Sequence, residues 1–95
     1  MEMNKPIWKE EKDTLLKEKT ENTPAIIVMN DDHNTFDHVI ECLQKYCGHE
    51  EHQAGQCALI IHTKGQCDVK RGDYDTLKPI YEALLDQKLS AKIEI

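Results

Sequence analysis

From residue 24 onward, apolar and polar positions recur with spacings that predict short strands and helices. Residues 25–29 are all apolar and rich in β-branched side chains, a pattern typical of a central strand covered on both faces. Residues 30–34 read Asn-Asp-Asp-His-Asn, and they end the strand because Asn and Asp favour turns. The folded part therefore begins with a buried strand followed by a polar loop.

A helix is predicted directly after this loop. Its apolar residues recur at i, i+3, i+4 and i+7 and therefore share one helical face. They are Phe36, Val39, Ile40 and Leu43. Asn34 or Thr35 can cap the helix, and Asp37 follows Asn34 by three residues, as in a capping box. Gly48 is a natural end for this helix.

A second helix is expected from about Glu50 to Thr63, because a glutamate suits the positive end of a helix and Gly65 can end it. Its inner apolar stripe consists of Ala54, Cys57, Ala58 and Ile61. Residues 66–70 alternate in polarity and predict a short strand with Cys67 and Val69 facing inward.

The last two elements are a helix and a strand. Pro79 is tolerated only near the start of a helix, so the third helix is expected to begin near Asp75. Its apolar face consists of Leu77, Ile80, Tyr81, Leu84 and Leu85. Three alternating apolar residues then predict a final strand, and they are Ala91, Ile93 and Ile95.

The element order is thus β-α-α-β-α-β, which predicts an α+β fold. We expect a three-stranded, mostly antiparallel sheet with three helices packed on one face. This folded domain covers residues 24–95. Residues 1–23 are dominated by Lys and Glu with few apolar residues, so we expect them to form a flexible arm.

Charge and composition narrow the function classes. The 95 residues carry a formal net charge of -6, which argues against nucleic-acid binding and against a polybasic membrane contact. No apolar run is long enough to cross a bilayer, and the N-terminus lacks a secretory signal, so we expect a cytoplasmic protein. In that compartment the cysteines are expected to be free structural thiols, namely Cys42, Cys47, Cys57 and Cys67.

Two features can carry chemistry: the Asn30-Asp31-Asp32 sequence and His62. Taken separately, each has an ordinary explanation, since Asn and Asp form turns and a histidine near an apolar face is often structural. If the loop and the end of the second helix meet, their side chains surround a polar site with an apolar floor. The other histidines are expected on the surface, without zinc-ligand spacing, and they are His33, His38, His49 and His52.

The chain resembles the Clp protease adaptor family (ClpS) over residues 24–95, on two motifs. One is VMNDDHNTFDHVIECLQKYCGHE, with the family's N-D-D between the first strand and first helix, and the other is CALIIHTKGQCDV. The resemblance implies a three-stranded antiparallel sheet with three helices, and no catalytic activity and no cofactor. It also implies binding of proteins that begin with Leu, Phe, Tyr or Trp, and their delivery to the N-terminal domain of the AAA+ unfoldase of the Clp protease, with help from the N-terminal arm.

The same resemblance implies the site residues. Those around the ligand's α-amino group would be Asn30, Asp31, Asp32 and His62. The side-chain pocket would be lined by Val28, Met29, Asn34, Phe36, Val39, Ala58, Ile61 and Leu89. Many members read N-D-D-Y-T-P-M, whereas Phe36 stands here at the methionine position and Ala58 is a small residue on the second helix. These departures affect the choice among bulky side chains.

Two other function classes fit parts of the pattern. A small hydrolase would use His62 with Asp31 or Asp32, yet no serine or cysteine is positioned as its nucleophile. A scaffold without a ligand pocket is the second alternative, because the C-terminal domain of the ribosomal stalk protein resembles this fold. Turnover assays test the first alternative, and binding of peptides that differ only in their first residue tests the second.

Overall fold

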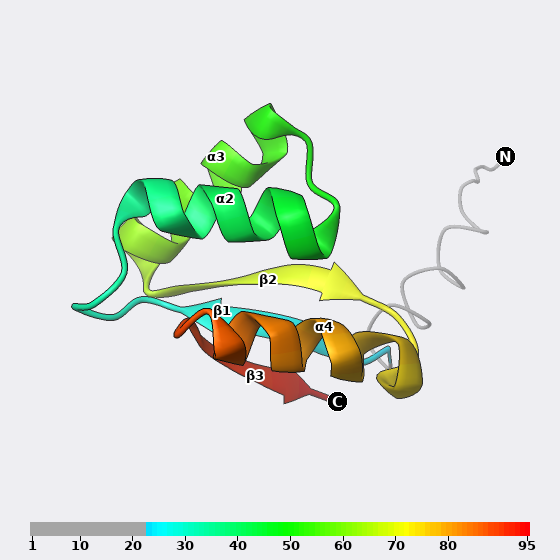
Figure 1. Cartoon of the computed structure of the whole chain (residues 1–95). Helices are drawn as coiled ribbons and strands as arrows, with labels where there is room; N and C mark the ends of the chain where they lie inside the picture. The colour runs from blue at the N-terminus through cyan, green and yellow to red at the C-terminus, as the bar shows by residue number, and fades with distance from the viewer. Residues whose placement is uncertain (1–22) are drawn as a thin grey trace, which may run out of the picture.

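The computed structural model describes residues 23–95, so the expected arm, residues 1–23, lies outside the described part except for Thr23. Figure 1 shows the order of elements that the spacing predicted, β-α-α-β-α-β. The elements are β1 (Ala25–Met29), α2 (Phe36–Cys47), α3 (Glu51–Lys64), β2 (Gln66–Arg71), α4 (Tyr74–Asp86) and β3 (Ser90–Glu94). The predicted α+β class and element order are confirmed.

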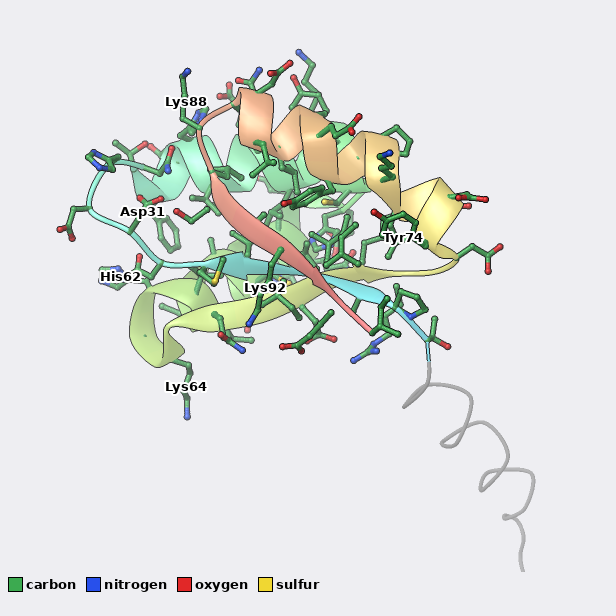
Figure 2. All side chains as sticks on the ribbon, turned by 90° about the horizontal axis from the view of Figure 1, so that it is seen from below. Asp31, His62, Lys64, Tyr74, Lys88 and Lys92 are labelled. Atoms are coloured by element: carbon green, nitrogen blue, oxygen red, sulfur yellow. The ribbon has the colours of Figure 1, made fainter. Side chains whose placement is uncertain are left out.

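The sheet has the order β2-β1-β3, and both pairs are antiparallel, so β1 is central. The helices lie on one face, and the view from below in Figure 2 shows strands in front of them. The expected packing of the three helices on one face of the sheet is therefore confirmed. Ile26 and Val28 belong to the core under the helices, whereas Ile27 pairs with Asp68 and Lys92. Ile27 is buried as well.

A bulge in β2 explains why one expected surface histidine is buried. Ile26 pairs with Lys70 and Ile27 with Asp68, so Val69 is an extra residue in β2. Nε2 of His49 lies 2.7 Å from the Val69 carbonyl oxygen. A carbonyl only accepts, so Nε2 carries the proton and donates it. The expectation that His49 lies on the surface was wrong, since this bond and burial at 7% exposure place it inside.

The first residues of α2 resolve the choice of cap. The hydroxyl of Thr35 accepts a 3.1 Å hydrogen bond from the backbone N–H of His38, so Thr35 is the cap. The suggested capping box of Asn34 and Asp37 does not form, because the Asn34 side chain bonds elsewhere. Gly48 ends the helix in the left-handed conformation, with φ 75°, as its sequence position predicted.

Helix α4, the third of the predicted helices, begins slightly earlier than predicted. Tyr74 is its first residue, so Pro79 is the sixth residue and lies beyond the first turn. Its ring nitrogen cannot donate to the carbonyl of Asp75, and α4 tolerates the loss of that one bond. The buried core that the three helices form with the sheet includes Ile26, Val28, Leu43, Leu77 and Leu84.

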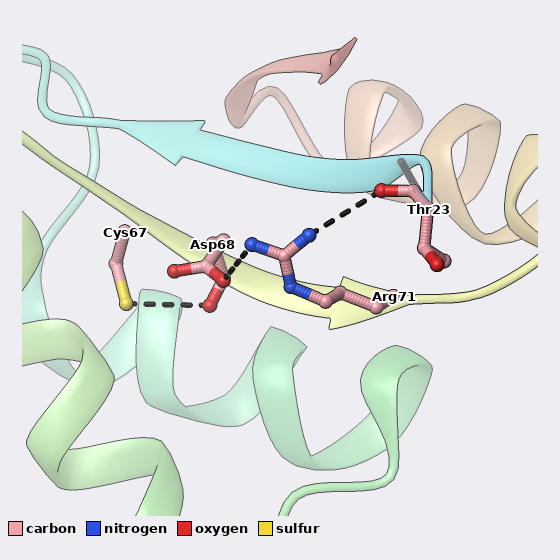
Figure 3. A network of polar contacts seen from close by, with 4 residues as sticks. All are labelled: Thr23, Cys67, Asp68 and Arg71. Carbon is pink, nitrogen blue, oxygen red and sulfur yellow. Dashed lines mark hydrogen bonds and ion pairs between the residues drawn. The ribbon is translucent and has the colours of Figure 1, made fainter. Parts of the chain in front are cut away.

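Polar contacts on the edge strand β2 join it to the residue that precedes β1 (Figure 3). The Arg71 guanidinium donates to the Thr23 carbonyl at 3.3 Å and pairs with the Asp68 carboxylate at 3.1 Å. The Cys67 thiol donates to the Asp68 carbonyl at 3.5 Å. The ion pair is half exposed and adds little stability, so these contacts chiefly attach the chain entering β1 to the edge strand.

Candidate functional site

The site is built where the loop after β1 meets the end of α3. Residues 30–34 form this loop, called here the NDD loop. The backbone N–H of Asn30 donates a 2.9 Å hydrogen bond to the carbonyl of Gly65, the residue that caps α3. Figure 2 shows Asp31 and His62 at the same end of the molecule. The NDD loop and the end of the helix that carries His62 are therefore neighbours in the fold.

The Asp31 carboxylate organises the NDD loop from within. Its Oδ1 accepts hydrogen bonds from the backbone N–H groups of His33 at 2.9 Å and Asn34 at 3.0 Å. Its Oδ2 accepts from the Ser90 hydroxyl at 2.8 Å and from the Asn34 side-chain amide at 2.9 Å. The acceptor positions of this carboxylate are thus largely occupied by the protein itself.

These contacts also set the charge state of Asp31. Desolvation by burial acts to raise its pKa, but the hydrogen bonds from Ser90, Asn34 and His33 favour the ionised form and outweigh it. The net result is a pKa below the ordinary value for aspartate. Asp31 is therefore an ionised residue at neutral pH that holds the loop together.

The remaining polar candidates differ from Asp31 in being exposed. Asn30, Asp32 and His62 all have exposed side chains. Within residues 23–95 no hydrogen bond engages the Asp32 carboxylate or the His62 ring. These three side chains are called here the rim. Their oxygen and nitrogen acceptors remain available, and a cation with several N–H donors requires such acceptors.

A small cavity of about 10 Å³ adjoins this rim at Asn30, whereas Asp32 and His62 are not among its lining residues. It is lined by Val28, Met29, Asn30, Asp31, Asn34, Val39, Ile61 and Leu89. Six of the eight residues expected in the pocket are among them, and the two that are absent are Phe36 and Ala58. Phe36 begins α2 and is 45% exposed, while Ala58 is buried in the core at 2% exposure. A role for Phe36 or Ala58 in the pocket stays a prediction.

The size of the cavity limits what it holds in this conformation. About 10 Å³ is close to the space that a single water molecule needs. Leucine and phenylalanine side chains are far larger, so a ligand side chain has to widen the cavity. The walls come from β1, the NDD loop, α2, α3 and the residue before β3.

Sequence reasoning missed two residues that hold the site, Ser90 and Lys88. The Ser90 hydroxyl bonds to Asp31, and the Lys88 carbonyl accepts a 2.9 Å hydrogen bond from the Asn34 side chain. Lys88 also has a left-handed backbone, with φ 72°. A serine at the start of a strand and a lysine in a turn carry no sequence signal for these contacts.

Within the described part of the chain, no helix has the length and apolarity needed to span a bilayer. The same residues contain no group of three or more His, Cys, Asp or Glu side chains arranged to hold a metal ion. The cysteines among them are all free, and Cys42 and Cys47 are buried.

Comparison with known proteins identifies the family. The sequence model of ATP-dependent Clp protease adaptor protein ClpS matches residues 19–92. The chain belongs to this family. It is a family of protease adaptors, so the resemblance carried by the NDD loop and the His62 segment is confirmed at the level of family.

Two relatives of the ClpS family show how far the similarity extends. The ClpS adapter protein of Thermosynechococcus vestitus is 38% identical over 61 residues, covering 63% of this chain and 65% of that protein. The ClpS adapter protein of Nostoc sp. is 37% identical over 67 residues, covering 70% of this chain and 69% of that protein. The aligned part therefore spans about two thirds of the length of these relatives.

A solved ClpS structure has the same fold. It is Agrobacterium tumefaciens ClpS2 bound to L-phenylalaninamide, with a TM-score of 0.72 and 17% sequence identity. The match covers 76% of this chain and 94% of that one. The likeness supports the three-stranded sheet with three helices independently of the sequence.

Proposed function

We propose that this chain is an adaptor that binds proteins through a free α-amino group and a bulky hydrophobic first side chain. It then delivers them to the AAA+ unfoldase of the Clp protease in the cytoplasm. The observation that carries the proposal is the Asn30–Gly65 hydrogen bond, which joins the NDD loop to the end of α3 beside a cavity with polar and apolar lining residues. Membership in the Clp adaptor family supplies the delivery step.

The rim suits a chain terminus because an α-ammonium has three N–H donors and a positive charge. We assign its partners as the Asn30 side-chain oxygen, the Asp32 carboxylate and a ring nitrogen of His62. Asp32 is preferred over Asp31, because the oxygens of Asp31 already accept hydrogen bonds from the NDD loop and Ser90. An internal peptide bond has one donor and no charge, so it would leave this site unsatisfied.

The ligand of the structural neighbour supports the same ligand class. L-phenylalaninamide, bound by Agrobacterium tumefaciens ClpS2, has a free α-amino group and an aromatic side chain, like the first residue of a protein. A charge-assisted hydrogen bond contributes about 1.5–3 kcal/mol, and burial of a Leu or Phe side chain contributes about as much. The loss of peptide freedom on binding opposes these gains, so we expect a dissociation constant on the order of micromolar. Neither the α-amino contacts nor the side-chain pocket is expected to suffice alone.

Fluorescence anisotropy with peptides that differ only in their first residue tests the proposal. Leu-, Phe-, Tyr- and Trp-initiated peptides should bind, whereas an Asp-initiated peptide and an acetylated Leu peptide should not. His62→Ala should weaken binding at least several-fold. His52→Ala is the matched control, because His52 is an exposed histidine at the opposite end of α3. Equal affinity for free and acetylated termini would contradict the proposal.

Delivery is tested separately with the Clp unfoldase and peptidase. A Leu-initiated reporter protein should be degraded faster when the full chain is added, and His62→Ala should remove that acceleration. A reporter beginning with Asp should be unaffected. Peptide binding without accelerated degradation would separate the recognition role from the adaptor role.

A further inference from the structure

Two hydrogen bonds attach the NDD loop to the turn between α4 and β3, and they lie on either side of Leu89. Before it, the Lys88 carbonyl accepts a 2.9 Å hydrogen bond from the Asn34 side chain. After it, the Ser90 hydroxyl donates a 2.8 Å hydrogen bond to Asp31. We call Asp31, Asn34, Lys88 and Ser90 the loop–turn clamp. Leu89 lies between the two attachments, is 4% exposed and lines the cavity.

The two attachments are coupled through a direct contact. The Asn34 side-chain amide donates to both Asp31 oxygens, at 3.1 Å and 2.9 Å, while it also donates to the Lys88 carbonyl. Loss of the Ser90 hydroxyl would therefore remove one of the hydrogen bonds that Oδ2 of Asp31 accepts and loosen the position of Asn34, which donates to the same oxygen. Ser90 and Asn34 act on the cavity only through other residues, so they are positioning residues.

The turn has a backbone conformation that benefits from such support. Lys88 has φ 72°, in the left-handed region that residues other than glycine disfavour. The turn itself provides the bond from the Lys88 N–H to the Leu85 carbonyl at 2.9 Å and from the Leu89 N–H to the Leu84 carbonyl at 3.1 Å. The clamp adds contacts from the NDD loop, so the loop and the turn form one continuous wall of the cavity.

We propose that the loop–turn clamp holds Leu89 as a fixed wall of the pocket and so sets how large a first side chain the pocket accepts. This inference rests on the proposed function. With Leu89 fixed, widening has to come from other lining residues, among them Val39 of α2 and Ile61 of α3. A leucine side chain then packs on every side, whereas a tryptophan needs a larger displacement. Release of Leu89 removes contacts from leucine and gives room to tryptophan.

Ser90→Ala tests the clamp, with two matched controls. Ser90→Thr keeps the hydroxyl, and Thr63→Ala removes a hydroxyl whose 2.8 Å hydrogen bond to the Leu59 carbonyl stays within α3. Anisotropy gives the ratio of association constants for Trp- and Leu-initiated peptides. We expect Ser90→Ala to shift this ratio toward tryptophan at least fivefold, and both controls to stay within twofold of the wild type. An unchanged ratio in Ser90→Ala, or a shifted ratio in Ser90→Thr, would overturn the proposal.

Hydrogen exchange provides a measurement that does not depend on peptide binding. The backbone N–H groups of His33 and Asn34 both donate to Asp31, so Ser90→Ala should raise their exchange rates at least tenfold. Unchanged exchange overturns the clamp itself, and faster exchange with an unchanged peptide ratio overturns its role in selectivity. If Ser90→Ala does not fold, Asn34→Ala removes the other attachment and should shift the ratio in the same direction.

A failure of the proposed function would look different from a failure of the clamp. The wild-type chain would then bind Leu-, Trp- and Asp-initiated peptides equally, before any variant is compared. In that case the role in selectivity is refuted with the proposed function. The physical coupling of Ser90 to the NDD loop is still decided by hydrogen exchange at His33 and Asn34.

Discussion

The backbone N–H of Asn30 donates a 2.9 Å hydrogen bond to the carbonyl of Gly65, which is 35 positions further along the chain. Gly65 ends α3 with φ 99°, a conformation that glycine adopts far more readily than other residues. One glycine therefore both ends the helix that carries His62 and presents the acceptor that positions the NDD loop. Its backbone conformation should matter to stability and to ligand binding.

Gly65→Ala is predicted to destabilise the fold by about 1–2 kcal/mol, because the left-handed backbone brings Cβ too close to the following carbonyl. Gly55→Ala is the matched control, since it lies inside α3 and an added Cβ at either position meets no atom within 4 Å apart from the local backbone and chain neighbours. This control should stabilise the chain by about 0.5–1 kcal/mol. Urea unfolding measures both values, and a change of the same sign for the two variants would contradict the prediction.

His49→Ala should destabilise the fold, because it leaves the buried carbonyl of the bulged residue Val69 without its donor. An unsatisfied buried acceptor costs about 1–3 kcal/mol, and the lost side-chain packing adds to this. His49→Gln retains an N–H donor and should recover part of the loss. Urea midpoints for the two variants provide the test, and equal destabilisation would argue against a role for the hydrogen bond.

Asp31 and Asp32 are predicted to have separate roles despite being adjacent. Asp31→Asn should destabilise the fold at pH 7 by about 1–3 kcal/mol, because one acceptor oxygen becomes a donor facing other donors. Asp32→Asn should leave stability nearly unchanged and weaken peptide binding. Urea unfolding and anisotropy on both variants separate the roles, and a reversed pattern would contradict the assignment.

The stabilising effect of Asp31 should also depend on pH in a defined direction. Its pKa in the folded state is below the ordinary value of 3.8. The contribution to stability is therefore fully present above about pH 3.8 and is lost as pH falls through the lower folded pKa. Below that range the wild type and Asp31→Asn should converge in stability, and a constant difference between pH 7 and pH 2.5 would contradict the prediction.

Two thiols are predicted to resist alkylation in the folded chain. Burial raises the pKa of Cys47 to about 11, and burial together with the neighbouring Cys57 thiol raises that of Cys67 to about 12. At pH 8 the reactive thiolate then amounts to roughly one part in a thousand or less. Mass spectrometry after brief iodoacetamide treatment should show both sites far less modified in buffer than in urea. Equal modification would show that these thiols are more accessible than their burial implies.

The sequence predicts the elements well because local spacing determines them. The apolar run of β1 and the glycines that end α2 and α3 fix three boundaries to within a residue. The NDD loop also contacts Gly65 at the end of α3, the arrangement that the sequence analysis considered. Contacts between distant residues were not predictable in this way. Ser90 reaches Asp31 from 59 positions away, and no periodicity reports such a pair.

Backbone irregularities account for the remaining differences. The bulge at Val69 gave His49 an interior partner, which the composition of the α2–α3 connection does not indicate. The choice between Thr35 and Asn34 as the cap of α2 depended on Asn34 bonding to Asp31 and to the distant Lys88 carbonyl. In each case a local pattern allowed several outcomes, and a contact formed only in the folded chain selected one.

The cavity of about 10 Å³ has a kinetic consequence for recognition. A bulky side chain enters only when the surrounding walls are apart, so the measured affinity is scaled by the fraction of molecules in that state. If about one molecule in ten were open, the apparent dissociation constant would be about tenfold weaker than the intrinsic one. In stopped-flow experiments the observed binding rate should then level off at high peptide concentration, at a rate set by the motion of the protein itself.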